Sequence, residues 1–142
     1  MNPPENLVEL AKKIAGEVGV DGALVCAVVE KESSWETWAI RYEPAFRARY
    51  VAPLELPPTA EIARSMSWGL MQLMGQSARE LGFNGPLPQI CDPATGLLWG
   101  AKKLARVIED AHGDVAVGLE LWNGGADPKY AADAMARMKN YE

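Results

Sequence analysis

The sequence predicts a single, mainly α-helical domain with little or no β-sheet, spanning residues 1–142. Apolar residues recur at spacings of three and four in several segments, which is the period of an amphipathic helix. The alternation of polar and apolar residues that is typical of a half-buried strand is nearly absent. Apolar residues form 49% of the 142-residue chain, enough to fill one core at this length.

The first two helices are predicted from spacing and from a cap. Residues 5–18 carry apolar side chains such as Leu7 and Ala11 on one face, so we expect a helix there. Asp21 can accept hydrogen bonds from the free N–H groups at the start of a second helix over 22–35.

The middle of the chain is rich in proline. Residues 36–58 contain four prolines, so we expect an irregular segment with at most a small hairpin within 40–56. A short helix over 59–65 and a compact segment over 67–76 follow. The irregular segment and a Gly/Pro-rich loop over 82–93 are the places where a site could be built.

The last third of the chain again has helical spacing. Pro93 suits a helix start and leads into an amphipathic helix over 94–111. Asp92, directly before this proline, is expected to be a turn or cap residue. Asp114 can cap a helix over 115–122, and Asp127-Pro128 opens a last helix that runs to about residue 141.

Few residues suited to metal binding or nucleophilic catalysis are present. The one histidine, His112, is expected at a helix end, and Cys26 and Cys91 lie far apart with no CxxC or HExxH motif. We therefore expect no metal and no cofactor, and a Ser-His-Asp triad is equally unsupported. The two thiols could pair in a disulfide, but two separate thiols are the simpler expectation.

The charge and the apolar runs limit the partners. The net charge of −5 argues against nucleic acid as the main partner. The longest apolar run is the seven residues 23–29, too short to insert into a membrane. The first residues lack the basic and apolar regions of a secretory signal, so we expect synthesis in the cytoplasm. We expect the domain to be a monomer.

The second predicted helix carries a carboxylate within its apolar stripe. At 3.6 residues per turn, Glu32 falls between Val25 and Val28 around the helix, whereas Glu30 falls on the opposite side. Burial would raise the pKa of Glu32 and suit it to general acid catalysis. The alternative is a solvated glutamate just beyond the last buried turn.

Four of the five tryptophans lie at the ends of predicted elements beside polar residues. Their placement favours a cleft with mixed aromatic and polar walls, although a row of tryptophans is more often part of a core. The fifth, Trp99, falls on the long amphipathic helix, where we expect it to pack. The four candidates for the cleft are Trp35, Trp38, Trp68 and Trp122.

Three motifs follow one another along the chain: Glu32-Ser33, Gly69-Leu70-Met71-Gln72 and Trp122-Asn123-Gly124-Gly125. In this order they resemble those of the soluble lytic transglycosylase domain family of the lysozyme-like superfamily, which is related to goose-type lysozymes. Asp92-Pro93 also fits the family pattern. The resemblance covers about residues 6–141 and implies a lysozyme-like fold with a glycan cleft.

The resemblance implies that the substrate is the glycan strand of peptidoglycan. The bond cleaved would be the β-1,4 bond between N-acetylmuramic acid and N-acetylglucosamine, with Glu32 as the catalytic acid/base and a 1,6-anhydro sugar as product. The other positions expected to contact the substrate, from the motifs and the residues near them, are Ser33, Trp35, Tyr42, Glu43, Met71, Gln72, Trp122 and Asn123.

The chain departs from the family pattern at two places. Trp122 stands where the family usually has tyrosine, and an indole offers only a donor N–H. Either Trp122 donates to Glu32 or Tyr42 supplies the hydroxyl. Glu43 is either a solvated loop acid or a second carboxylate that holds a water and makes the enzyme a hydrolase.

A lytic transglycosylase is the leading hypothesis, and a hydrolytic goose-type muramidase is the first alternative. A non-catalytic glycan-binding or wall-associated domain and an unrelated helical interaction domain are the others. Without a signal peptide, such a domain would reach the cell wall as a phage endolysin, as part of a phage tail or as cargo of a secretion machine.

Overall fold

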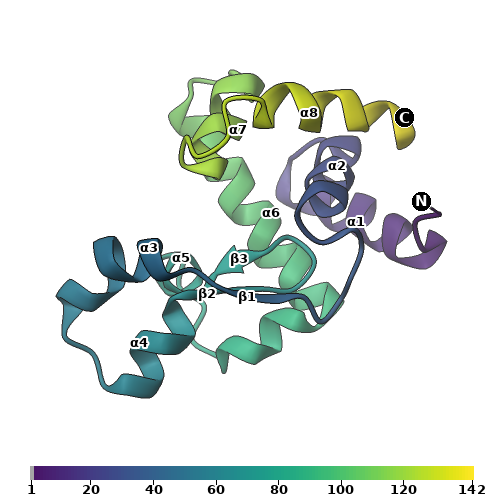
Figure 1. Cartoon of the computed structure of the whole chain (residues 1–142). Helices are drawn as coiled ribbons and strands as arrows, with labels where there is room; N and C mark the ends of the chain where they lie inside the picture. The colour runs from purple at the N-terminus through teal and green to yellow at the C-terminus, as the bar shows by residue number, and fades with distance from the viewer. Residues whose placement is uncertain (1) are drawn as a thin grey trace.

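The computed structural model describes residues 2–142 and shows two groups of elements joined by one long helix (Figure 1). The long helix runs from the upper helical group to the lower group that contains the sheet. The upper group and the long helix are α1 (Glu5–Val18), α2 (Gly22–Ser33), α6 (Pro93–Asp110), α7 (Val115–Asn123) and α8 (Tyr130–Arg137).

The lower group is built around a small antiparallel sheet with the strand order β1-β2-β3. Arg41 pairs with Ser67, and Ser67 pairs with Met74, so these three side chains share one face of the sheet. The elements of this group are β1 (Ile40–Tyr42), α3 (Pro44–Phe46), η1 (Arg47–Val51), η2 (Ala52–Leu54), α4 (Pro58–Arg64), β2 (Met66–Trp68), β3 (Leu73–Met74), α5 (Gly75–Glu80) and η3 (Leu87–Cys91).

The helix starts that aspartates predict are confirmed where the side chain caps the helix. Each carboxylate accepts a hydrogen bond from the backbone N–H three residues later: Asp21 at 3.2 Å, Asp92 at 3.1 Å and Asp114 at 3.1 Å. The mainly helical fold class is confirmed, and the bounds of α1, α6 and α7 lie within one residue of the prediction.

Three predicted segments are wrong in detail. Helix α2 ends at Ser33 rather than at residue 35, because Ser34 and Trp35 adopt left-handed φ angles of 52° and 65°. The segment 36–58 is not irregular, since it contains β1, α3, η1 and η2. No hairpin forms within 40–56: β1 pairs with β2 instead, a distant partner that local alternation cannot reveal.

The predicted last helix is also shorter than expected. Helix α8 ends at Arg137 and continues as the 3₁₀ turn η4 (Met138–Asn140). It begins at Tyr130, because the chain after Asp127-Pro128 first makes a turn in which the Tyr130 N–H donates to the Asp127 carbonyl at 3.1 Å.

The hydrophobic core has two parts. The first is formed by α1, α2, α6, α7 and α8, and the second by the sheet, α5 and η3. Trp99 packs at the second cluster with its ring 5.6 Å from that of Phe83, which confirms its predicted packing role. Cys26 and Cys91 are free, buried thiols, one in each cluster.

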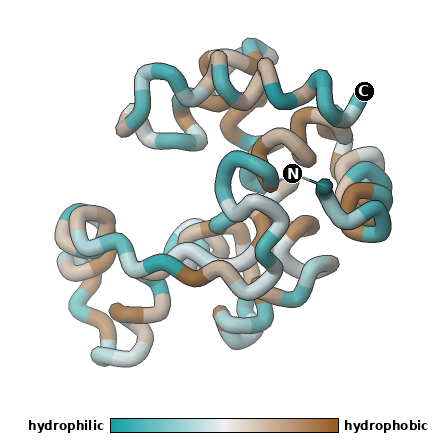
Figure 2. The backbone as a smooth tube through the Cα atoms, turned by 45° about the vertical axis from the view of Figure 1, so that its right-hand side comes forward, coloured by the Kyte–Doolittle hydropathy of each residue, from teal (hydrophilic) through white to brown (hydrophobic). Residues whose placement is uncertain are grey.

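Helix α2 differs from the outer helices. Along those helices the backbone alternates between hydrophilic and hydrophobic segments (Figure 2). In α2, every residue from Leu24 to Glu30 is buried. The side of α2 opposite the predicted stripe is therefore covered too, and Glu30 lies in the interior rather than in solvent.

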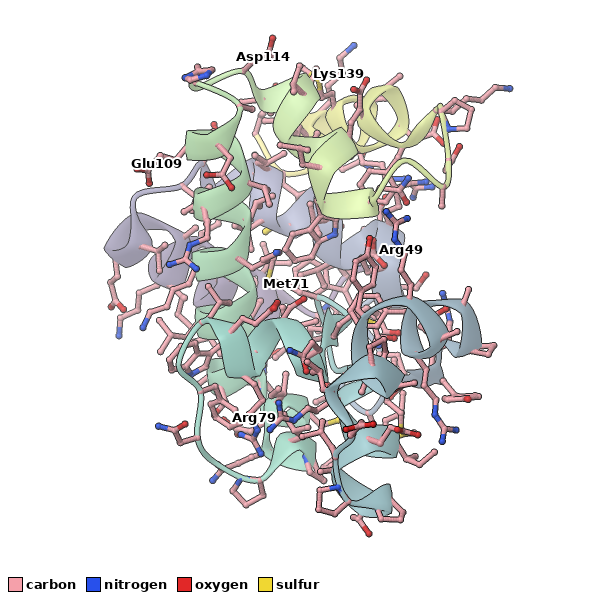
Figure 3. The ribbon with its side chains drawn as sticks, turned by 90° about the vertical axis from the view of Figure 1, so that its left-hand side faces the viewer. Arg49, Met71, Arg79, Glu109, Asp114 and Lys139 are labelled. Carbon is pink, nitrogen blue, oxygen red and sulfur yellow. The ribbon has the colours of Figure 1, made fainter. Side chains whose placement is uncertain are left out.

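The turn Gly69–Gln72 joins the two core clusters. Gly69 has a φ of 74°, and a Cβ there would lie 2.6 Å from the Ile90 carbonyl oxygen, so no larger residue fits. Met71 lies near the middle of the molecule beside α6, far from the peripheral Glu109 (Figure 3). There it packs against Gly100 of α6.

Within residues 2–142, no helix combines the length and the apolar character that a membrane crossing requires.

We expect Gly100→Ala to destabilise the protein by about 1–3 kcal/mol, because the new Cβ would lie 2.8 Å from the Cβ and 2.4 Å from the Sδ of Met71. The matched control is Gly16→Ala in α1, where no atom lies within 4 Å of the new Cβ. The control should stabilise by about 0.5–1 kcal/mol, since alanine favours the helix. Urea unfolding midpoints measure both, and equal stabilisation by the two changes would contradict the Met71 contact.

Candidate active site

The carboxylate of Glu32 lies in the last turn of α2 and receives two hydrogen bonds on the same oxygen. The Tyr130 hydroxyl donates to Glu32 Oε2 at 2.5 Å, and the Trp122 indole N–H donates to the same atom at 3.4 Å. Trp122 belongs to α7 and Tyr130 is the first residue of α8. Helix α2 therefore meets two consecutive helices that are distant from it in sequence at this carboxyl group.

Burial raises the pKa of Glu32, and this effect outweighs the hydrogen bonds from Tyr130 and Trp122 that favour the charged form. The charges of Arg41 and Lys31 also lower the pKa, by less. The pKa of Tyr130 is raised by its own burial and by Glu32, so the phenol keeps its proton and remains the donor. Both donors reach Oε2, and within residues 2–142 no hydrogen bond reaches Oε1, so Oε1 is the oxygen suited to carry a proton.

The other end of α8 is fixed to α2 by a buried network around Glu30. Arg137 Nη1 donates to Glu30 Oε2 at 2.6 Å, and the Tyr141 hydroxyl donates to Glu30 Oε1 at 2.8 Å. Burial raises the pKa of Glu30, but these hydrogen bonds outweigh it and leave the pKa below its ordinary value. Glu30 is thus an ionised structural residue, whereas Glu32 two positions later is suited to carry a proton.

Ser33 and Gln72 fix the backbone beside Glu32. The Ser33 hydroxyl donates to the Leu70 carbonyl at 2.7 Å, which ties the end of α2 to the Gly69–Gln72 turn. The Gln72 side-chain amide donates to the Ala39 carbonyl at 2.9 Å and accepts from the Ser67 hydroxyl at 2.7 Å. Both side chains therefore form these hydrogen bonds within the protein.

Asn123 holds the turn between α7 and α8. With its amide oxygen facing the backbone, it accepts from the N–H groups of Ala126 at 3.0 Å and Asp127 at 2.7 Å. It follows Trp122 directly, so this turn helps to set where the indole and Tyr130 lie.

Two positions expected to contact substrate lie in the core. Trp35 is only 5% exposed, and its indole N–H donates to the Tyr141 hydroxyl at 2.9 Å. Met71 is 1% exposed. Trp68, a further candidate cleft wall, is buried in the second cluster and donates to the Ala63 carbonyl. None of these side chains offers a free face to a sugar in this structure.

Tyr42, Glu43 and Trp38 lie at the surface of the lower group. The Tyr42 hydroxyl accepts from Arg47 Nη1 at 3.1 Å, so the hydroxyl that contacts Glu32 comes from Tyr130 and not from Tyr42. Within residues 2–142, the Glu43 carboxylate forms no hydrogen bond or ion pair, with Glu32 or any other group. Trp38 is 70% exposed and is free to stack on a ligand.

Sequence reasoning missed Tyr130. The signal was available: Tyr130 shares a helix face with Ala134, and a tyrosine on a buried face needs a partner for its hydroxyl. That the partner is Glu32, far away in the sequence, could not be read from local pattern.

Residues 2–142 contain no group of three His, Cys, Asp or Glu side chains that could hold a metal ion. The site is instead one carboxyl group with two neutral donors, an arrangement suited to proton transfer.

No solved structure was found to match the chain. Residues 9–141, nearly the whole chain, match the family model of the Transglycosylase SLT domain. Together with the mainly helical fold, this match shows that the chain belongs to the SLT transglycosylase domain family of the lysozyme-like superfamily, whose members are lytic transglycosylases acting on peptidoglycan.

Proposed function

We propose that this enzyme cleaves the β-1,4 bond between N-acetylmuramic acid and N-acetylglucosamine with Glu32 as its single catalytic acid/base. The observation that carries the proposal is the state of Glu32: burial raises its pKa, two donors occupy Oε2, and no residue among 2–142 donates to Oε1. A carboxyl in this state can give a proton to a leaving group and take one back.

In the first step, the proton on Glu32 Oε1 passes to the bridging oxygen as the bond from that oxygen to C1 of the muramic acid breaks. The resemblance to the family implies that the 2-acetamido group of the same sugar assists at C1. The Glu32 carboxylate that forms is stabilised by the donors from Tyr130 and Trp122.

In the second step, the 6-hydroxyl of the muramic acid attacks its own C1. Its proton passes to the Glu32 carboxylate, which restores the starting acid, and the new bond closes a 1,6-anhydro ring. No water enters, so no second carboxylate is needed.

The other predicted site residues are assigned by their contacts. We infer that Ser33, Gln72 and Asn123 act by fixing the backbone around Glu32, and that Trp35 and Met71 support that arrangement from the core. The exposed rings of Tyr42 and Trp38 remain available to the glycan. We further propose that the enzyme reaches the cell wall by release or export.

Glu32→Gln should abolish lysis of purified cell walls while leaving the fold intact, because glutamine keeps the shape of the side chain but cannot transfer a proton. Mass spectrometry of the products from the parent enzyme should find 1,6-anhydro ends. Glu43→Gln is the control and should keep both the rate and the product. Retained lysis by Glu32→Gln would refute the catalytic assignment, and reducing ends that disappear in Glu43→Gln would show a hydrolase.

Tyr130→Phe should lower kcat by about 10–100-fold, the effect of losing one hydrogen bond to a charged group. It should also move the pH profile. The rate falls as pH rises through the pKa of Glu32, because the first step needs the protonated acid. Without Tyr130 this pKa rises, so the falling limb should move to higher pH.

Trp122→Phe is the comparison for Tyr130→Phe, since its bond to Glu32 is long, at 3.4 Å. We expect a loss of about threefold or less and a smaller shift in the same direction. If the falling limb of the pH–rate profile of Tyr130→Phe stays at the same pH as in the parent enzyme, or moves to lower pH, the assignment of Tyr130 as the main donor is contradicted.

A further inference from the structure

Lys31 directly precedes Glu32 in α2 and contacts the start of α8 in three ways. Its ammonium lies 3.4 Å from Asp133 Oδ2 and 3.8 Å from Asp127 Oδ2. It also lies over the ring of Tyr130, 5.0 Å from the ring centroid. Lys31, the neighbour of Glu32 in sequence, therefore contacts the ring face of Tyr130, whose hydroxyl donates to Glu32.

These contacts are unusual for a surface lysine. The Lys31 side chain is only 16% exposed, whereas Asp127 and Asp133 are 44% and 50% exposed. Isolated exposed ion pairs contribute little to stability, because solvent screens their charges and the long side chains lose conformational entropy when they pair. A largely covered ammonium that combines two carboxylates with an aromatic face holds its partners more firmly.

The start of helix α8 is held by side chains other than that of its N-cap residue. The side chain of the N-cap residue, Lys129, forms no cap hydrogen bond, and the Lys129 N–H donates to Asp127 Oδ1 at 2.9 Å. Lys31 binds both sides of that start, through Asp127 in the preceding turn and Asp133 in the first turn of the helix. The ring of Tyr130 lies between these two anchors in the chain.

We propose that Lys31 is a positioning residue: it holds the Tyr130 ring where the hydroxyl donates to Glu32 Oε2, and it acts on catalysis through Tyr130. The proposal rests on the proposed role of Glu32. Lys31 itself gives no proton to the substrate, because its ammonium is directed at the ring and the two aspartates.

A direct effect of the Lys31 charge on Glu32 is the competing explanation, since that charge also favours the ionised carboxyl. The two explanations differ in what happens once Tyr130 can no longer donate. If Lys31 acts through Tyr130, removing Lys31 from the Tyr130→Phe variant lowers kcat no further. If Lys31 acts through its charge, removing it from that variant lowers kcat by the same factor as in the parent enzyme. A double-mutant cycle separates them.

The experiment compares the full chain with Lys31→Met, Tyr130→Phe and the double variant, using initial rates of muropeptide release from purified sacculi. We expect Lys31→Met to lower kcat about tenfold with little change in KM, since Lys31 does not touch substrate. Adding Lys31→Met to Tyr130→Phe should lower kcat less than twofold further. A further tenfold loss in the double variant overturns the proposal.

Two more variants test the geometry while keeping a positive charge at position 31. Lys31→Arg should restore most of the activity, because a guanidinium can pair with carboxylates and lie over a ring. Asp133→Asn weakens one anchor and should lower kcat in the same direction as Lys31→Met, by about two- to fivefold. Full activity of Lys31→Met, or an Asp133→Asn variant unchanged from the parent, overturns the proposal.

Lys139→Met serves as the control for losing a surface charge. Lys139 lies at the periphery of the molecule (Figure 3), and within residues 2–142 it forms no ion pair. It should match the parent. Glu32→Gln is measured in parallel, because retained lysis there refutes the proposed function, whereas an additive cycle with inactive Glu32→Gln refutes only the role of Lys31.

Discussion

The site depends on the contact between α2 and α8. Three successive residues of α2 make it: Glu30 holds Arg137 and Tyr141, Lys31 holds the start of α8, and Glu32 receives the Tyr130 hydroxyl. The two ends of α8 are thus fixed separately, and the hydrogen bond to the Glu32 carboxyl is formed at the first of them. Because residues Leu24 to Glu30 of α2 are all buried, this helix is held in the core, and the position of α8 relative to it sets the distance from Tyr130 to Glu32.

The Gly69–Gln72 motif has a structural explanation that its sequence does not suggest. In Gly69-Leu70-Met71-Gln72, the glycine permits a close approach to Ile90, Leu70 and Met71 enter the first core, and Gln72 binds backbone carbonyls. The turn therefore joins the two core clusters and fixes the end of α2 through Ser33. The motif thus holds the backbone beside Glu32 in place.

The sequence predicts contacts between residues that are close together in the chain and misses contacts between segments that are far apart in it. Helix starts at Asp21, Asp92 and Asp114 follow from a side chain and a backbone three residues apart, and the structure has all three caps. The desolvation of Glu32 follows from its place on the apolar stripe. The pairing of β1 with β2, the burial of Glu30 and the contact of Tyr130 with Glu32 each join segments separated by more than twenty residues, and no periodicity encodes them.

The tryptophan in place of the family's usual tyrosine becomes understandable once Tyr130 is included. An indole N–H can only donate, so it suits an oxygen that only accepts. Glu32 Oε2 is such an atom, because it receives the Tyr130 hydroxyl as well and the proton of the acid belongs on Oε1. Two donors on Oε2 therefore leave Oε1 as the oxygen that gives the proton in the proposed first step and takes one back in the proposed second step.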